Sequence, residues 1–163
     1  MKFCCTTFSI LCLFLLNACG LKPLYKADND SYQLLRTIEI KPINSIEGAE
    51  FYNHLSNIFP PSLKPKYLLT TKLTFSHKPS LIQVNSDILR KTVTIKVKYC
   101  INNIRTKEIL IQGEFSRLAS YSTTFSAYIN DTQKQSILKN LALISAEEVR
   151  NRVILHLENN QKK

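Results

Sequence analysis

The side chains that most often carry catalysis or bind metals are scattered in this sequence. Its three histidines lie on different predicted elements, and none has the HxxxH or HExxH spacing that places two metal ligands on one helix face. Glu147 and Glu148 are adjacent on a predicted helix, where neighbouring side chains splay about 100° apart, so they cannot share one substrate. The three glycines are too far apart for a phosphate-binding loop. We therefore expect no enzyme activity, no metal and no cofactor.

Binding of an anion is the chemistry that the sequence favours instead. In the stretch 92–99, basic and hydroxyl side chains alternate with apolar ones. Side chains two positions apart on a strand share a face, so Lys96 and Lys98 should lie beside Thr92 and Thr94. This face could meet a partner, and an ordinary solvated sheet face is the alternative interpretation.

Three further basic residues are candidates to bind phosphates or another anionic ligand. Arg90 and Lys91 stand where the strand begins, and Arg117 follows the next strand along the chain. The whole sequence has 22 Lys and Arg against 12 Asp and Glu, a formal net charge of +10. Such a charge favours an anionic partner.

The N-terminus has the order of a secretory signal: basic Lys2, a short apolar run, then Ala18 before Cys19. It resembles a bacterial lipoprotein signal, which implies cleavage after residue 18 and lipidation of Cys19. Asn17 departs from the small or aliphatic residue that is usual two positions before the cysteine. An uncleaved transmembrane helix is the alternative, but the apolar stretch is shorter than the ~20 residues that a spanning helix needs. An exported chain argues against nucleic acid as the anionic partner.

Cleavage would leave Cys100 as the single unlipidated cysteine, so the mature domain would contain no internal disulfide. It must then be held together by packing, for which residues 32–163 are sufficient as one domain. Residues 19–31 are predicted to be a tether without regular structure. Cys100 lies in an apolar run, and we expect it to be a small buried side chain.

Hydrophobic periodicity predicts the elements of this domain. Residues 36–41 alternate as a strand, and residues 44–59 have the period of a helix that ends at two prolines. Strands are expected over 69–76, over 92–99 and from 108 to either 115 or 121, with a loop over 77–87 and a hairpin turn at Asn102-Asn103, where Asn tolerates a positive φ. Gly113 within the last strand indicates a bulge or a close backbone approach.

The longest helix is predicted over 131–157, and Glu148 and Arg152 on it are spaced as an i,i+4 ion pair. Its expected apolar stripe consists of Ile137, Leu141, Ile144, Val149, Val153 and Leu157. The order β-α-β-β-β-α predicts an α+β fold, a two-layer sandwich. Its four-stranded, mostly antiparallel sheet should carry both helices on one face.

Three stretches together resemble the lipopolysaccharide-assembly lipoprotein (LptE) family of alphaproteobacterial type. They are the start Cys19-Gly20-Leu21-Lys22-Pro23-Leu24-Tyr25, the strand block from Arg90 to Tyr99, and the region from Gly113 to Tyr128 that contains Arg117 and Tyr121. The resemblance spans most of residues 19–157, and the element order is the one that this family has. Each motif is weakly specific, and their order and spacing strengthen the match.

The resemblance implies a function without catalysis. The family's lipoprotein plugs the outer-membrane β-barrel lipopolysaccharide translocon (an LptD-like barrel), helps it assemble and assists transport of lipopolysaccharide to the outer leaflet. It would be anchored through acyl chains, including palmitate, on Cys19 in the Gram-negative outer membrane and would face the periplasm. Thr92, Thr94, Lys96 and Lys98 would then be candidates to face the barrel. Arg90, Lys91 and Arg117 would be candidates, from their position only, to bind lipopolysaccharide.

Two other classes stay open at the level of sequence. One is a different outer-membrane lipoprotein, acting as an accessory to a transporter or as an activator of a cell-wall synthase. The other is a secreted enzyme, which would need a catalytic cluster that the sequence does not show.

Overall fold

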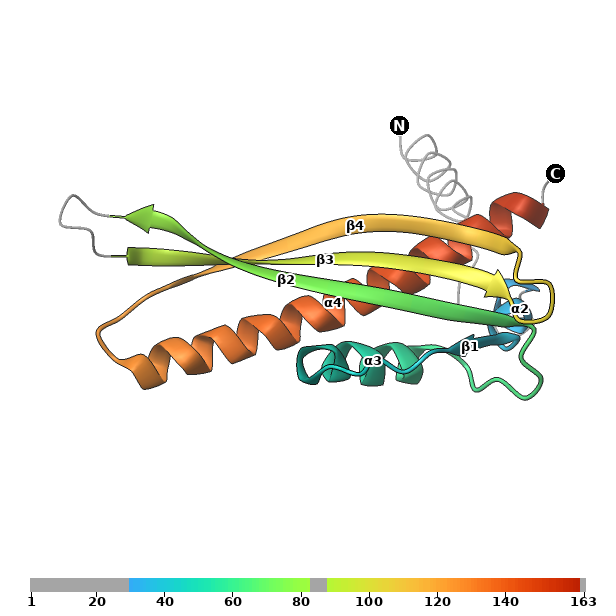
Figure 1. Ribbon diagram of the computed structural model, residues 1–163, viewed down its shortest axis with the longest axis horizontal. Helices are drawn as coiled ribbons and strands as arrows, with labels where there is room; N and C mark the ends of the chain where they lie inside the picture. The colour runs from blue at the N-terminus through green and yellow to red at the C-terminus, as the bar shows by residue number, and fades with distance from the viewer. Residues whose placement is uncertain (1–29, 83–87, 162–163) are drawn as a thin grey trace, which may run out of the picture.

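The computed structural model describes residues 30–82 and 88–161, and all structural statements below refer to these residues (Figure 1). In chain order the elements are α2 (Asp30–Leu35), β1 (Ile38–Ile40), α3 (Ile46–Ile58), β2 (Tyr67–Ile82), β3 (Ile88–Asn103), β4 (Ile109–Ser122) and α4 (Ala127–Gln161).

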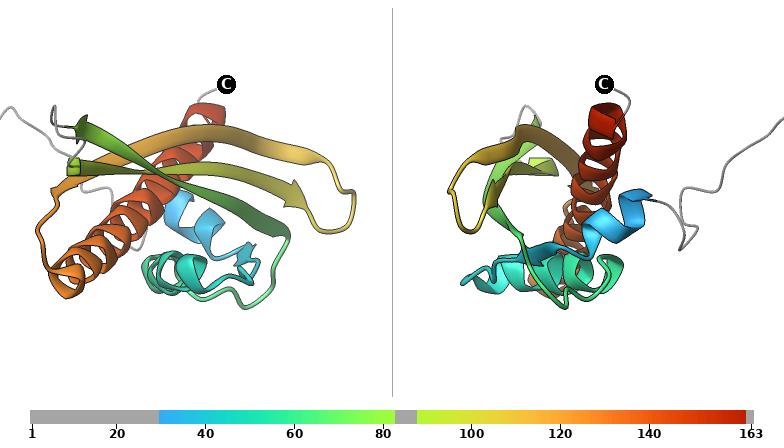
Figure 2. Two further views of the ribbon diagram at one scale, coloured as in Figure 1. Left: turned by 60° about the vertical axis from the view of Figure 1, so that its left-hand side comes forward. Right: turned by 90° about the vertical axis from the view of Figure 1, so that its right-hand side faces the viewer.

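The predicted α+β two-layer fold is confirmed. The four strands form one sheet in the order β1-β2-β3-β4, in which β1 runs parallel to β2 and the other neighbours are antiparallel. Figures 1 and 2 show that α3 and α4 lie on the same side of this sheet. One face is therefore covered by helices and the other is left open.

The core lies between the sheet and the two helices. Alternate side chains of β3, including Val93, Ile95 and Val97, are fully buried, as are Phe51 of α3 and Val149 of α4. Because strand side chains alternate between faces, the residues between them on β3 point to the open side. This single alternation separates an apolar layer from a polar surface.

Local signals set the limits of α3. The Ser45 hydroxyl accepts a hydrogen bond from the Gly48 N–H at 3.0 Å, which caps the helix at its start. A Cβ on Gly48 would lie 2.6 Å from both this hydroxyl and Ile43 Cγ2, so the cap requires a glycine there. The predicted end before the two prolines is confirmed, since α3 stops at Ile58.

The predicted loop over 77–87 is wrong in its first part, because β2 continues to Ile82. The strand passes through Pro79, and the pairing with β3 shifts register on either side of Leu81. Proline lacks the N–H of a ladder bond, and it is tolerated because β1 pairs only with residues 67–69 of β2. At Pro79 the strand is therefore an edge.

Two helices also differ from expectation. The short α2 lies across the end of the predicted tether and was not anticipated, although its Leu35 is buried against the core. The long helix α4 begins at Ala127 and ends at Gln161, so it is longer at both ends than the predicted 131–157. The Ser126 hydroxyl accepts a hydrogen bond from the Ile129 N–H at 3.4 Å, and this N-cap sets the start of α4 ahead of the periodic apolar residues.

The predicted turn of the β3–β4 hairpin is confirmed, but its asparagine acts differently from the prediction. The residue with a positive φ is Lys107 (φ 62°), and it is not an asparagine. The Asn103 side-chain oxygen instead accepts hydrogen bonds from the backbone N–H groups of Arg105 (2.9 Å) and Thr106 (3.2 Å). Asparagine thus acts here through its side chain, as in an Asx turn.

Gly113 is the site of a close approach and not of a bulge. It pairs in regular register with Tyr99, and the register shift lies at Ile101/Asn102. A Cβ on Gly113 would come within 2.5 Å of the Tyr99 hydroxyl oxygen and 2.7 Å of its ring. The glycine therefore makes room for the aromatic ring of the neighbouring strand.

The predicted apolar stripe of α4 is right except at Ile144, which is 53% exposed. At 100° per residue, position 144 lies about 140° around the helix from Val149. The buried stripe instead runs through Ala142, Ser145 and Ala146, whose small side chains allow close packing.

We expect a large difference between two truncations three residues apart on α4. Leu141→Ala should lower the free energy of unfolding by about 2–5 kcal/mol, since Leu141 is buried in the core. Ile144→Ala should change it by less than about 0.5 kcal/mol. Urea unfolding followed by circular dichroism measures both, and equal losses would contradict the orientation of α4.

Candidate functional site

The face of the sheet opposite the helices is the candidate binding surface, called the open face below. No described helix or strand packs on it, and its side chains are mostly polar or charged. From β2 it carries Thr70, Lys72, Thr74 and Ser76, from β3 Thr92, Thr94, Lys96, Lys98 and Cys100, and from β4 Gln112, Glu114, Ser116, Leu118 and Ser120.

Lysines dominate the centre of this face. Lys96 Nζ lies 3.3 Å and Lys98 Nζ 3.5 Å from the same Glu114 carboxylate oxygen, and Lys72 stands directly opposite Lys98 on β2. Hydrogen bonding and charge from Lys96, with Lys98 adding to it, lower the pKa of Glu114. The single carboxylate thus pairs with two of the three lysines, and like charges directly opposite each other in a sheet, such as Lys72 and Lys98, are unfavourable. An anion bound there would offset this repulsion.

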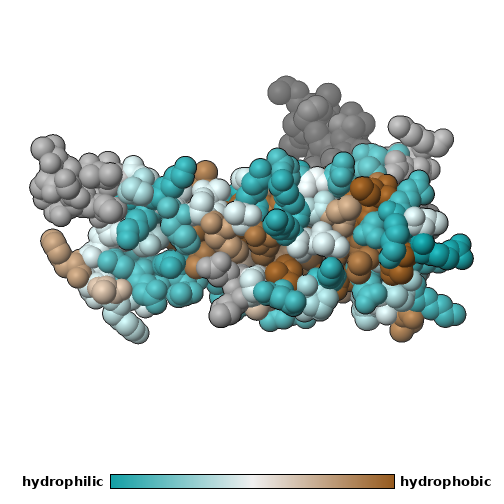
Figure 3. Space-filling model, in the orientation of Figure 1, coloured by the Kyte–Doolittle hydropathy of each residue, from teal (hydrophilic) through white to brown (hydrophobic). Residues whose placement is uncertain are grey.

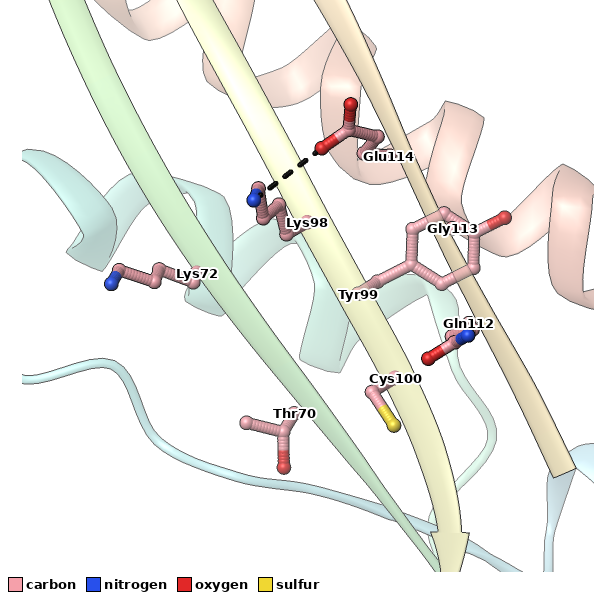
Figure 4. A pocket seen from close by; sticks show the side chains of 8 residues that line it. All are labelled: Thr70, Lys72, Lys98, Tyr99, Cys100, Gln112, Gly113 and Glu114. Carbon is pink, nitrogen blue, oxygen red and sulfur yellow. Dashed lines mark ion pairs between the residues drawn. The ribbon is translucent and has the colours of Figure 1, made fainter. Parts of the chain in front are cut away.

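A shallow hollow of ≈ 500 Å³ lies at this point (Figure 4). Its lining includes the side chains of Lys72, Lys98 and Gln112, which offer hydrogen-bond donors to an anionic oxygen. The other lining residues are Thr70, Tyr99, Cys100, Gly113 and Glu114. The hollow is suited to bind a phosphate or carboxylate group.

Cys100 lines this hollow and is half-buried, so the expectation of a buried core cysteine is wrong. The apolar run around it suggested the core. Position 100 has the same parity on β3 as Lys96 and Lys98, which places it on the open face.

The four residues predicted to share a sheet face do share one. Lys96 and Lys98 meet at Glu114, and the Thr92 and Ser120 hydroxyl oxygens lie 2.7 Å apart across β3 and β4. Thr94 is half-buried between Ser76 and Leu118 of the neighbouring strands. Their contact with a barrel stays a prediction.

The three predicted anion-binding residues, by contrast, do not form one patch. Arg90 follows the parity of the open face, whereas Lys91 and Arg117 follow that of the core face. Arg117 stands opposite Ile95, in the middle of β3, and points to α4. A role in binding an anion stays a prediction for each, but the three do not line one site.

Arg117 belongs to an ionic network that joins the sheet to α4. Its Nη2 donates to Glu148 Oε2 at 2.9 Å, and Arg152 Nε donates to Glu148 Oε1 at 2.7 Å. The Arg152 guanidinium also lies 4.8 Å from the centre of the Phe115 ring. The predicted Glu148–Arg152 pair is thus confirmed, and Arg117 is a third member that spacing along the chain could not reveal.

These contacts set the charge state of Glu148. The hydrogen bond from Arg152 lowers the pKa of this carboxyl most, and Arg117 adds to the effect, while partial burial opposes it. The same hydrogen bond raises the pKa of Arg152. The network stays ionised across the physiological range and fixes β4 to α4.

The histidines do not form a metal site among the described residues, in which no three potential ligands cluster. His54 Nε2 on α3 lies 3.4 Å from Glu147 Oε1 on α4, so this pair links the two helices. Lys139 and Glu50 make a second link at 3.7 Å.

The predicted lipidation site, Cys19, lies outside the described residues, as do the signal peptide and most of the tether. Among the helices that are described, none has the length and apolar character to cross a bilayer.

No family model matches the chain. It is 36% identical over 149 residues to the uncharacterized protein RP188 of Rickettsia prowazekii (strain Madrid E), and the alignment covers 91% of this chain and 95% of that protein. The chain belongs to the RP188 family. The alignment spans almost the full length of both proteins.

Solved structures show that this fold also occurs in more distant proteins. A candidate lipoprotein from Caulobacter crescentus is similar with a TM-score of 0.65 at 12% identity, over 81% of this chain and 98% of that one. The rare lipoprotein B of Shewanella oneidensis has a TM-score of 0.60 at 8% identity, over 78% and 98% of the two chains. Lipoprotein B of Nitrosomonas europaea has a TM-score of 0.59 at 8% identity, over 74% of this chain and 82% of that one. At these identities the likeness establishes the fold that the RP188 family adopts.

We expect the Glu148 network to make stability depend on pH. The folded-state pKa of Glu148 is lowered, so its contribution is present above pH 4.5 and is lost as the pH falls through the folded value. Glu148→Gln should lower the free energy of unfolding by about 1–2 kcal/mol at pH 7 and by progressively less below pH 4.5. Chemical unfolding between pH 3 and pH 7 measures this.

The control is Glu108→Gln, at an exposed carboxylate beside the β3–β4 turn. This variant removes the same charge outside the Glu148 network. A constant loss for Glu148→Gln at every pH would show that the carboxylate charge does not stabilise the junction.

Proposed function

We propose that this protein is a lipid-anchored outer-membrane lipoprotein that plugs the β-barrel lipopolysaccharide translocon, helps it assemble and assists lipopolysaccharide transport. The observation that carries the proposal is the two-layer fold, with both helices on one face of the sheet and an open cationic face on the other. Solved proteins of this fold include those named as lipoproteins from Shewanella and Nitrosomonas.

The N-terminal sequence supplies the anchor in this proposal. Acylation of Cys19 would hold the protein at the membrane, and more than one acyl chain is needed for stable attachment. Gly20 follows where inner-membrane lipoproteins usually carry Asp, which favours the outer membrane. The chain would then face the periplasm from its tether.

The shape of the domain suits a plug. β2 and β3 each have 16 residues, which at ~3.3 Å per residue makes the sheet roughly 50 Å long. That exceeds the ~25 Å apolar band of an outer-membrane barrel, so the domain could extend through a lumen. The hydroxyl rows of the open face, such as Thr92 and Ser120, could bond to the polar lumen wall.

Lipopolysaccharide would meet the lysines of the same face. Lys72, Lys96 and Lys98 surround the hollow or lie beside it, and ammonium groups attract phosphate oxygens. No reaction is proposed for this site, because it pairs no nucleophile with a general base. Binding and positioning are what its residue types can do.

Gentle detergent extraction of the tagged protein, followed by mass spectrometry of co-purifying proteins, tests the plug role. Recovery of a large β-barrel in equal amount, and loss of that barrel and of surface lipopolysaccharide on depletion, is the expected result. Recovery of a transporter or a cell-wall synthase instead would refute it in favour of an accessory lipoprotein.

A paired substitution tests the open face separately. Lys96→Gln with Lys98→Gln should weaken lipopolysaccharide binding at least about tenfold, because each cation near an anionic headgroup contributes favourably. The matched control is Lys64→Gln with Lys66→Gln. These substitutions remove the same charge from two exposed lysines in the α3–β2 connection. Isothermal titration calorimetry measures the affinity of both variants for lipopolysaccharide. Equal weakening would show that the effect depends on net charge alone and not on the open face.

A further inference from the structure

One end of the molecule carries apolar side chains that nothing described covers. The turn between β4 and α4 forms this end (Figure 1), where Phe125 is 107%, Tyr128 81% and Ile129 44% exposed. Figure 3 shows hydrophobic surface at the same end. Isolated exposed apolar residues are ordinary, but three within five positions, two of them aromatic, form a patch.

The turn holds these side chains outward through its own hydrogen bonds. The Asn130 side-chain oxygen accepts from the Thr124 N–H at 2.8 Å, and its amide donates to the Thr124 carbonyl at 2.8 Å. The Ser126 N–H also bonds to the Thr124 hydroxyl at 3.3 Å. Phe125 thus lies between Thr124 and Ser126, which both form hydrogen bonds, and the ordered turn exposes its side chain to solvent.

Basic side chains lie near this apolar end and outnumber the exposed Asp131 of α4. Arg90 and Lys91 at the start of β3 pair with Ser122 and Tyr121, the last residues of β4 before the turn. Lys78 lies nearby on β2, opposite Thr92, and Lys134 follows on the second turn of α4. None of these four cations makes an ion pair with a described residue.

We propose that the β4–α4 turn inserts into the interface of an anionic phospholipid bilayer. Aromatic side chains favour the boundary between headgroups and acyl chains, and Lys and Arg beside them bind headgroup phosphates. Phe125 and Tyr128 enter the interface, and the nearby cations stay at the phosphate level. This contact requires neither a barrel nor lipopolysaccharide, and so goes beyond the proposed function.

The charge pattern favours a bilayer over another occupant. The patch combines an apolar tip with basic residues near it, and an anionic membrane complements this pattern. The contact is separate from the lipid anchor, because α2, which follows the tether, lies at the opposite end (Figure 1).

The sequence contains no tryptophan, so a single introduced tryptophan reports on one position. In the full chain carrying Cys19→Ala, which removes the acylation site, we would make Phe125→Trp. The probe is a vesicle of phosphatidylglycerol and phosphatidylethanolamine, with brominated acyl chains as quenchers. Phe125→Trp should shift its emission to the blue and be quenched, and vesicles of phosphatidylcholine alone should have little effect.

The control is Leu63→Trp, which replaces a 77% exposed leucine in the α3–β2 connection at the other end. It should be neither shifted nor quenched. Quenching at both positions, or at neither, overturns the proposal. An emission shift that depends on protein concentration without vesicles also overturns it, because it would show that a second copy covers the turn.

A second set of variants tests the basic residues near the tip. Arg90→Gln and Lys91→Gln, added to Phe125→Trp, should each lower partitioning into anionic vesicles about fivefold. Lys64→Gln and Lys66→Gln remove the same charge elsewhere and should change it far less. Circular dichroism confirms that each variant is folded, and equal effects of the two pairs would contradict a local contact.

Discussion

The burial of one face of β3 is the constraint on which the rest of the structure depends. Val93, Ile95 and Val97 are fully enclosed between the sheet and the helices, and β3 lies between β2 and β4 over nearly its whole length. A shift of one residue in its pairing would move all of these side chains to the solvent. The register of both neighbours is therefore determined, and with it the face on which every polar side chain of the three strands lies.

That register creates two different electrostatic environments from residues close in sequence. On the open face, Lys96 and Lys98 compete for the single carboxylate of Glu114 and leave an excess of positive charge. On the other face, Arg117 is neutralised by Glu148, which Arg152 also binds. The first arrangement can accept an anionic ligand. The second joins β4 to α4. It thereby holds α4 against one face of the sheet and leaves the lysines of the other face accessible.

The elongated shape follows from the same strands. The β2–β3 hairpin and α4 extend well beyond α3, so the apolar core is thickest where α3 covers the sheet and the far end is formed by a turn (Figure 1). Such a domain presents three distinct surfaces: an end at α2, a polar side, and an aromatic tip.

Periodicity alone was enough to predict the order of the main elements, the open polar face and the Glu148–Arg152 pair. These depend on contacts between residues near in sequence, or on an alternation that any buried strand shows. The partner of Arg117, the place of Cys100, the exposure of Ile144 and the path of β2 through Pro79 depended on how distant segments pair. Only the tertiary structure decided them, because the register between strands and the rotation of α4 about its axis are set by packing across the whole core.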